Sequence, residues 1–333
     1  MNDLSKLKVS SSPHIRAANT IHQIMLDVLI ALTPALVIGI FVYGLRALTV
    51  TLCSVAGCVF FEWIYEVISH KPITIKDLSA AVTGVLLAFC LPVSSPLWMV
   101  LLGDLFAIVV VKQLFGGIGK NFVNPALSAR AFLLASFAGI VSVIPRIRTA
   151  LPLFTTPVDV VTTSTPLVQM KQGALPDISI LQDALGMVGG CIGEISALAL
   201  LAGGVYLVYR KVISPKIPLI YIGTVAIVTF FFPQGNNNLT WMAYQLLSGG
   251  LMLGAIFMAT DYTTSPITPN GQIVYAVGCG LLTVFIRYFG TYPEGVSYSI
   301  LVMNLFVNLI EKATIPRRFG EIKQRKKAAA NEK

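Results

Sequence analysis

Ten apolar runs of roughly membrane-spanning length set the strongest limit on how this chain can fold. About 20 apolar residues in a helix cross about 30 Å of hydrocarbon. The runs lie at residues 24–44, 46–69, 77–92, 96–112, 128–144, 184–209, 217–233, 241–260, 272–290 and 297–313. We therefore predict an all-α polytopic membrane protein with about ten transmembrane helices. The third run is short and ends in LPVSSP, which also fits a broken or partly re-entrant helix lined by protein.

Composition agrees with this fold class. Of the 333 residues, 55% are hydrophobic and 12% are charged. A soluble domain with a polar surface is excluded by these values. The chain is thus expected to be a multi-pass protein of a bilayer.

The positive charges predict an orientation. With the N-terminus in the cytoplasm, 19 of the 24 Lys and Arg residues fall on the cytoplasmic side, and an even number of spans places both termini there. The outer five are Arg46, Arg146, Arg148, Lys171 and Arg287. The net charge of +9 is explained by topology and by lipid headgroups, so no nucleic-acid partner is predicted.

The two halves of the chain share a short pattern. Ser95–Pro96 and Ser265–Pro266 each precede a span that ends in Phe-Gly, a Gly-rich polar link and a new helix. Five spans per half start the second half on the opposite side, which predicts two inverted five-helix repeats with the functional centre near their interface. The predicted divisions are a first repeat at 1–150, an outer loop at 151–183, a second repeat at 184–313 and a basic cytoplasmic tail at 314–333.

A hydroxyl-rich run, DVVTTSTPL at 159–167, lies in the longest polar interval, on the predicted outer side. Pro166 biases Thr165 towards an extended or turn geometry that presents its side chain outward. Such a hydroxyl can be esterified, so the run is a candidate cofactor attachment site. A Ser/Thr loop that only solvates the membrane surface is the alternative.

Acids within spans are costly and usually face a cavity or a partner. Asp104 is the deepest, and we predict that it forms a candidate ion path with Glu62, Glu66 and Asp261. A structural role against a neighbouring subunit is the alternative for each. We predict no metal site, because the five cysteines lack CxxC spacing and the three histidines are scattered.

Six motifs in a fixed order carry a family resemblance across essentially the whole chain. They are SSPHIR at 11–16, IMLDVLIALTPA at 24–35, GKNFVNPALSARAF at 119–132, DVVTTSTPL at 159–167, TDYTTSPITPNG at 260–271 and PEGVSYSILVMN at 293–304. The chain resembles the D subunit of the Rnf electron transport complex and, more distantly, the B subunit of the sodium-pumping NADH:quinone reductase.

The resemblance implies an inner-membrane subunit of a bacterial or archaeal complex that couples ferredoxin:NAD electron transfer to Na⁺ or H⁺ movement. The chain alone is expected to lack complete catalytic activity and catalytic residues of its own. NADH, ferredoxin and iron–sulfur chemistry would belong to its partners, the A, B, C, E and G subunits of the complex.

The resemblance also implies FMN linked through its phosphate to a threonine. The family pattern maps onto Asp159, Thr162, Ser164 and the acceptor Thr165. This sequence departs from the pattern by carrying Thr163 where Gly is usual and Ser164 where Ala is usual, which adds rival hydroxyls near the acceptor.

A second flavin, a non-covalent riboflavin, is implied at the cytoplasmic link. There Asn121 and Asn124 match paired asparagines of the related reductase subunit. Amide groups in an apolar slot suit the edge of an isoalloxazine ring. Helix capping by Asn124 ahead of Pro125 is the alternative.

A second class of function fits the same spans. Ten helices in inverted repeats equally suit a transporter or channel for a small polar solute with no redox role. Covalent flavin discriminates between the two classes, because it makes the purified chain fluoresce in a denaturing gel.

Overall fold

The computed structural model describes residues 20–147, 151–154, 162–173, 175–176, 178–235, 237–291 and 294–316. Within these ranges the chain is helical and no β-strand is formed. The predicted all-α class is therefore confirmed at this level.

Four helices are long and apolar enough to cross a bilayer: α1 (Ile21–Tyr43), α2 (Leu45–Ile68), α13 (Pro269–Phe289) and α14 (Val296–Thr314). A fifth candidate is the pair formed by α11 (Asn238–Leu247) with α12 (Leu251–Leu253) and the π-helix η4 (Gly254–Met258), which bends by 60° at its break. Four or five candidate spans are what a multi-pass membrane protein requires, although they are fewer than the ten predicted.

The remaining elements are shorter. They are η2 (Ile75–Asp77), α3 (Ser79–Phe89), α4 (Leu97–Leu105), the π-helix η3 (Phe106–Gln113), α5 (Pro125–Ser136), α6 (Ala138–Val141), α7 (Pro166–Lys171), α8 (Ile180–Leu185), α9 (Ala197–Tyr209) and α10 (Lys216–Phe231). At about 1.5 Å per residue, α3 rises roughly 16 Å, about half of a bilayer core. The third apolar run is therefore broken, as its LPVSSP ending allowed.

Capping residues explain where several helices begin. Thr20 and Gln23 form a capping box ahead of α1, with the Thr20 hydroxyl accepting from the backbone N–H of Gln23. Thr268 caps α13 and Asn124 caps α5, each followed by proline at the first helical position. These polar signals extend the helices a few residues beyond the apolar runs.

The sixth predicted span, 184–209, is wrong as a continuous helix, because α8 ends at Leu185 and α9 begins only at Ala197. Glycines in the intervening segment lower helix propensity and allow close backbone approach. A Cβ added to Gly193 would lie 2.2 Å from the Cβ of Phe89. The N–H of Gly193 instead donates to the Phe89 carbonyl at 3.0 Å, and that of Ile192 donates to the Leu91 carbonyl at 3.1 Å. This non-helical segment thus lies against the break after α3.

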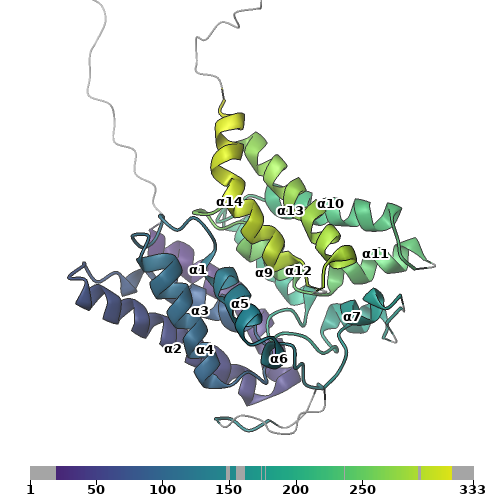
Figure 1. The fold of residues 1–333 in the computed structure, drawn as a ribbon, viewed down its shortest axis with the longest axis horizontal. Helices are drawn as coiled ribbons and strands as arrows, with labels where there is room; N and C mark the ends of the chain where they lie inside the picture. The colour runs from purple at the N-terminus through teal and green to yellow at the C-terminus, as the bar shows by residue number, and fades with distance from the viewer. Residues whose placement is uncertain are drawn as a thin grey trace, which may run out of the picture.

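The two halves of the chain lie side by side, with residues 21–141 on one side of Figure 1 and 197–314 on the other. Helix α1 packs against α9, and α5 packs against α14. One large apolar cluster, including Leu32, Phe89 and Tyr221, fills the interior across both halves.

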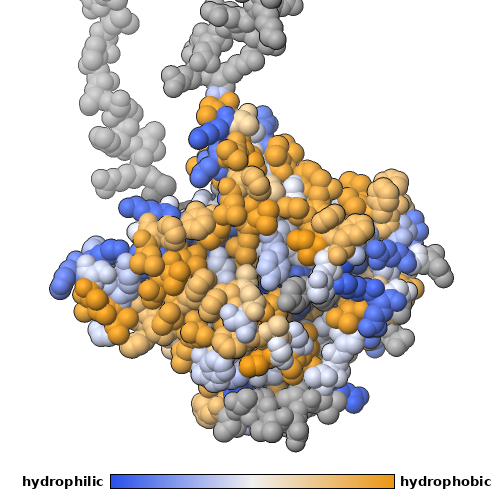
Figure 2. All heavy atoms as spheres, in the orientation of Figure 1, coloured by the Kyte–Doolittle hydropathy of each residue, from blue (hydrophilic) through white to orange (hydrophobic). Residues whose placement is uncertain are grey.

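The outside of the helices is also apolar. Hydrophobic side chains cover much of the face seen in Figure 2. Large residues such as Phe41, Leu219 and Phe285 are exposed on the long helices. An apolar surface of this extent fits contact with lipid or partner helices.

Candidate functional site

Thr165 lies where the hydroxyl-rich run meets helix α7. Asp159 lies outside the described residues. Thr165 is extended, with φ −70° and ψ 155°, as expected for a residue that precedes proline. Its hydroxyl oxygen accepts a hydrogen bond from the N–H of Val168 at 3.4 Å. Thr165 is therefore the N-cap of α7, and its hydroxyl keeps its proton and a second lone pair.

The neighbouring hydroxyls differ in exposure. Thr162 and Ser164 are exposed, and Thr162 pairs with Pro145 through an isolated backbone bridge. The Thr163 hydroxyl is buried without a hydrogen-bond partner among the described residues, and it lies 2.5 Å from where a Cβ on Gly189 would stand. Thr163 therefore faces the protein, and Thr165 is half-buried beside a small pocket.

That pocket has a volume of about 20 Å³ and is lined by Thr165, Ser248 and three acids, Asp183, Glu194 and Glu294. This volume holds about one water molecule. A flavin cannot enter it, so a group bound to Thr165 must extend outward. Burial raises the pKa of Asp183, and the hydrogen bond from Ser248 lowers it in part.

Asn121 and Asn124 lie on the wall of a larger cavity of about 270 Å³. Its lining is mostly apolar and includes Ile24, Leu86 and Phe257. The Oδ1 of Asn124 accepts from the N–H groups of Ala126 and Leu127 at 3.1 and 3.3 Å, so the helix-cap interpretation of Asn124 is confirmed.

The side chain of Asn121 makes fewer hydrogen bonds than that of Asn124. Its amide nitrogen donates to the Val123 carbonyl at 3.3 Å, and its Oδ1 accepts no hydrogen bond among the described residues. Asp261 lines the same cavity and is held by the hydroxyls of Thr263 and Thr264 at 2.9 and 3.2 Å. The structure thus brings Asn121, Asn124 and Asp261 together, although only the two asparagines were predicted to share a site.

Asp104 lies apart from them, fully buried between α2 and α4. Its Oδ1 accepts from the Ser54 hydroxyl at 2.6 Å and from the Cys58 thiol at 3.2 Å. Its Oδ2 is buried without a hydrogen-bond partner in the described part of the chain.

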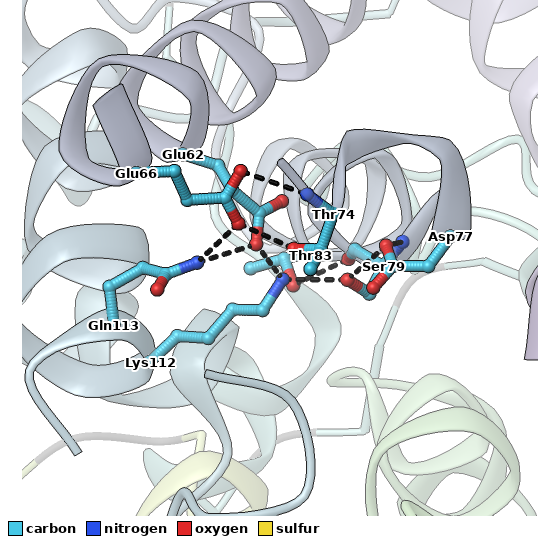
Figure 3. A network of polar contacts seen from close by, with 8 residues as sticks. All are labelled: Glu62, Glu66, Thr74, Asp77, Ser79, Thr83, Lys112 and Gln113. Carbon is cyan, nitrogen blue, oxygen red and sulfur yellow. Dashed lines mark hydrogen bonds and ion pairs between the residues drawn. The ribbon is translucent and has the colours of Figure 1, made fainter. Parts of the chain in front are cut away.

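Glu62 and Glu66 belong to a third polar group, shown in Figure 3. The Lys112 ammonium lies 2.7 Å from Oε1 of Glu62, and the Gln113 amide donates to the same oxygen at 2.8 Å. Glu66 accepts from the backbone N–H of Thr74 at 3.0 Å and also from the Thr74 hydroxyl.

An apolar cluster separates Asp104 from this network. Cys58, Ala80 and Ile108 pack together, fully or almost fully buried. Cys58 lies one helical turn from both Ser54 and Glu62 on α2, and Ile108 lies between Asp104 and Lys112 on the facing helix. The four acids of the predicted ion path are therefore distributed over three places.

Two groups of polar residues were not predicted from the sequence. Lys112, in the first group, was counted among the cytoplasmic charges and Gln113 was not considered, yet both are buried beside Glu62. Lys112 lies eight positions after Asp104, so the two side chains fall on similar faces of the fourth span. This spacing could have indicated that Lys112 also faces the second span, which carries Glu62.

The second such group lies between the halves, where ligand atoms of Cys191, Glu194 and Glu294 fall within 4.8 Å of one another. Arg130 forms an ion pair with Glu294, and its guanidinium lies 3.8 Å from the Cys191 sulfur. A guanidinium already supplies the positive charge there, so this arrangement favours an ion pair over a metal site.

Known proteins match this chain along nearly its whole length. The model of the NQR2, RnfD, RnfE family matches residues 8–320. The D subunit of the Na(+)-translocating ferredoxin:NAD(+) oxidoreductase complex of Acetobacterium woodii is 51% identical, over 99% of this chain and 100% of that protein. The D subunit of the proton-translocating ferredoxin:NAD(+) oxidoreductase complex of Clostridium ljungdahlii is 43% identical, over 94% and 96%. The resemblance drawn from the motifs is thereby confirmed, and the chain belongs to the NQR2, RnfD, RnfE family.

Proposed function

We propose that this protein is a membrane electron-carrier subunit of an Rnf-type complex that couples ferredoxin:NAD electron transfer to Na⁺ or H⁺ translocation. The observation that carries this proposal is the full-length match to a relative named as the D subunit of such a complex. The chain acts with the other subunits of that complex and completes no reaction alone.

The proposed topology has ten crossings in two inverted five-helix repeats, with both termini in the cytoplasm. The order of helices supports it: α1, α2, α3, α4 with η3, and α5 correspond to α9, α10, α11 with η4, α13, and α14. The packing of α1 on α9 and of α5 on α14 is what a two-fold relation between the halves requires.

The proposed covalent cofactor is FMN, held as a phosphoester of Thr165 on the outer side, where it serves as a one- or two-electron carrier. Thr165 is supported by its half-buried side chain, which lines a pocket too small to enclose a ring. The attached ring then lies outside this pocket, accessible to a partner subunit.

Thr165→Asn tests the attachment, because asparagine still caps α7 but offers no hydroxyl. We expect the purified variant to lose fluorescence in a denaturing gel while its amount in the membrane is unchanged. Thr163→Val is the matched control, since it removes a hydroxyl that faces the protein. Fluorescence that survives Thr165→Asn, or disappears in the control, contradicts the assignment.

The proposed second cofactor is riboflavin in the cavity of Asn121 and Asn124. At about 270 Å³ the cavity is near the lower end of the roughly 300–1,000 Å³ of small-molecule sites. The free Oδ1 of Asn121 suits an N–H donor of a bound ring.

Acid extraction of the complex, followed by chromatography, tests this site. Riboflavin without phosphate is the expected extract, and Asn121→Ala should lower its amount while leaving the covalent fluorescence intact. An extract that holds only FMN, or an Asn121→Ala extract equal to that of the unmodified complex, excludes riboflavin from this cavity.

The proposed ion path passes through three separate places, those of Asp104, of Glu62 with Glu66, and of Asp261. An Asp at the centre of a span costs about 2.5–3.5 kcal/mol on insertion scales, so a role beyond stability is expected. Asp104→Asn should preserve flavinylation and flavin reduction but lower ion uptake per electron in vesicles that contain the whole complex. An unchanged ratio of ions to electrons at any residual activity counts against this role.

A further inference from the structure

Lys112 places a positive charge inside the polar network of Figure 3. Its ammonium lies 2.7 Å from Oε1 of Glu62 and 2.6 Å from the Ser79 hydroxyl. The Lys112 and Glu62 side chains are only 4% and 1% exposed. The ammonium therefore occupies a position surrounded by oxygen atoms and hidden from bulk solvent.

This ion pair engages only one of the two carboxylate oxygens of Glu62. The Oε2 of Glu62 is buried and has no hydrogen-bond partner within the described residues. A buried pair with an unsatisfied oxygen is weak evidence for stability, because desolvation of the two charges offsets much of their attraction. The arrangement fits a site that exchanges its cation better than it fits a structural bridge.

A polar connection leads from this site to the surface. The Ser79 hydroxyl, which accepts from Lys112, donates to Oδ1 of Asp77 at 2.7 Å. Asp77 is half-buried at the end of η2, in the polar link between α2 and α3. Lys112 and Ser79 also line the 270 Å³ cavity, so the ammonium can turn from Glu62 towards the flavin that we propose to bind there.

We propose that the oxygens of Glu62 and Ser79 form a site for a monovalent metal cation of the Na⁺ class, and that Lys112 is a tethered cation that occupies it in this conformation. The inference rests on the proposed function, because it concerns an ion that the complex moves. Carboxylate and hydroxyl oxygens suit a hard cation. A monovalent ion that replaces one ammonium leaves the net charge at Glu62 unchanged.

Because the metal cation and the Lys112 ammonium compete for the same oxygens, Lys112 controls access of the cation to Glu62. The cation reaches Glu62 only while the ammonium is displaced towards the cavity. The segment that carries Lys112 is the π-helix η3, whose i→i+5 pattern is less stable than an α-helix and occurs often at functional sites.

Lys112→Met tests this control of access in the purified intact complex, because it removes the ammonium and keeps the oxygens. If the displaced state has a population of about 0.1–10%, the variant should bind ²²Na⁺ about 10- to 1,000-fold more tightly. Lys216→Met, which removes an exposed lysine at the start of α10, should leave the Na⁺ affinity unchanged. Adding Glu62→Gln to Lys112→Met should abolish the gain. An affinity equal to that of the unmodified complex, or a gain that persists in the double variant, overturns the proposal.

A second measurement needs no variant. An amine-reactive reagent is applied to the unmodified complex in Na⁺ or in choline, and modification of Lys112 is quantified by peptide mass spectrometry. Na⁺ should increase modification of Lys112 and leave that of Lys216 unchanged; equal modification of Lys112 in both salts overturns the proposal. Covalent fluorescence and electron transfer, measured on the same sample, report the proposed function separately, so failure of the cation site is distinguishable from failure of the function.

Discussion

Two breaks in apolar helices are held by buried arginines, one in each half of the chain. The break between α3 and α4, at 90–96, accepts hydrogen bonds from Arg46 at Val93 and Ser95, 3.4 and 2.9 Å. The break between α11 and α12, at 248–250, accepts from Arg287 at Ser248 and Gly249, 3.1 and 3.4 Å. Carbonyls that leave a helix inside a membrane protein need such donors, because water is absent there.

The two arginines differ in the number of chain segments to which they donate hydrogen bonds. Arg46 employs all three guanidinium nitrogens and reaches a third segment, donating to the Leu153 carbonyl at 2.5 Å. Arg287 binds the single segment 245–249, where it also donates to the backbone carbonyl and to Oε1 of Gln245, and its Nε is buried without a partner in the described residues. The first break is thus joined through Arg46 to α2 and to Leu153, and the second is joined through Arg287 to α13. A buried arginine can therefore join its helix to two separate segments, as Arg46 does, or to one, as Arg287 does.

Arg46→Ala should have the largest effect on stability, since the carbonyls that lose a charged donor belong to two separate segments. Removing such a buried partner costs about 3–5 kcal/mol. The measurement is the apparent Tm of the purified protein in detergent. Arg210→Ala is the matched control, because Arg210 forms a half-exposed ion pair with Asp27 at 3.2 Å and should lower the Tm little. Equal losses in the two variants would show that Arg46 does not hold the break.

Arg287→Ala should cost less, about 2–4 kcal/mol, because its acceptors all lie in the single segment 245–249. It should also lower covalent fluorescence at Thr165. Gly249 carries the left-handed φ of 73° in this break, and a Cβ there would lie 2.0 Å from Leu167 on α7. The measurement is covalent fluorescence per folded protein. A greater loss of fluorescence in Arg46→Ala than in Arg287→Ala would show that Arg287 does not position the break beside α7.

Gly193→Ala tests the contact of the first break with the non-helical segment before α9. The new methyl group meets the Cβ of Phe89, so we expect a loss of about 1–3 kcal/mol. Gly223→Ala in α10 is the control, since nothing lies within 4 Å of the added Cβ there and alanine favours a helix. A Gly193→Ala Tm at or above that of Gly223→Ala would show that the segment is free to move away.

Asp183→Asn should have the smallest effect and concerns only the second break, where Asp183 accepts from Ser248 at 2.7 Å. Burial raises the folded-state pKa above the unfolded value of about 3.9, so the folded protein binds this proton more tightly. The contribution to stability is therefore greatest below that pH and falls as pH rises towards the folded pKa. We expect Tm measured against pH to show this fall in the unmodified protein but not in Asp183→Asn. Identical pH profiles would remove Asp183 from the energetics of the break.

The sequence predicted the features that depend on neighbouring residues. The apolar runs at 24–44 and 272–290 located α1 and α13 within a few residues. Pro166 predicted the extended geometry of Thr165, and Asn124–Pro125 predicted a helix cap. Each of these signals lies in residues that are consecutive in the chain, so it can be recognised in a single sequence.

Features that depend on distant contacts were not predictable. The charge count placed Arg46 and Arg287 among the outer charges, yet both are buried against carbonyls far along the chain. The break before α9 was missed because few of its residues are charged, although its glycines lower helix propensity. The close approach of Gly193 to Phe89 is the part that the sequence does not show. The separation of Asp104 from Glu62 likewise depends on Ile108, which one-dimensional spacing cannot reveal.

The two arginines also impose different requirements during synthesis. Arg46 enters the membrane before its acceptors exist, because Val93, Ser95 and Leu153 follow it by 47, 49 and 107 residues. At about 5–20 residues per second, its guanidinium waits on the order of seconds, and its place at the second residue of α2 lets it remain at the lipid headgroups meanwhile. Arg287 arrives after Gln245 and Ser248, which precede it by 42 and 39 residues. The first half therefore inserts with a charge still unpaired, whereas the second half closes as soon as its arginine emerges.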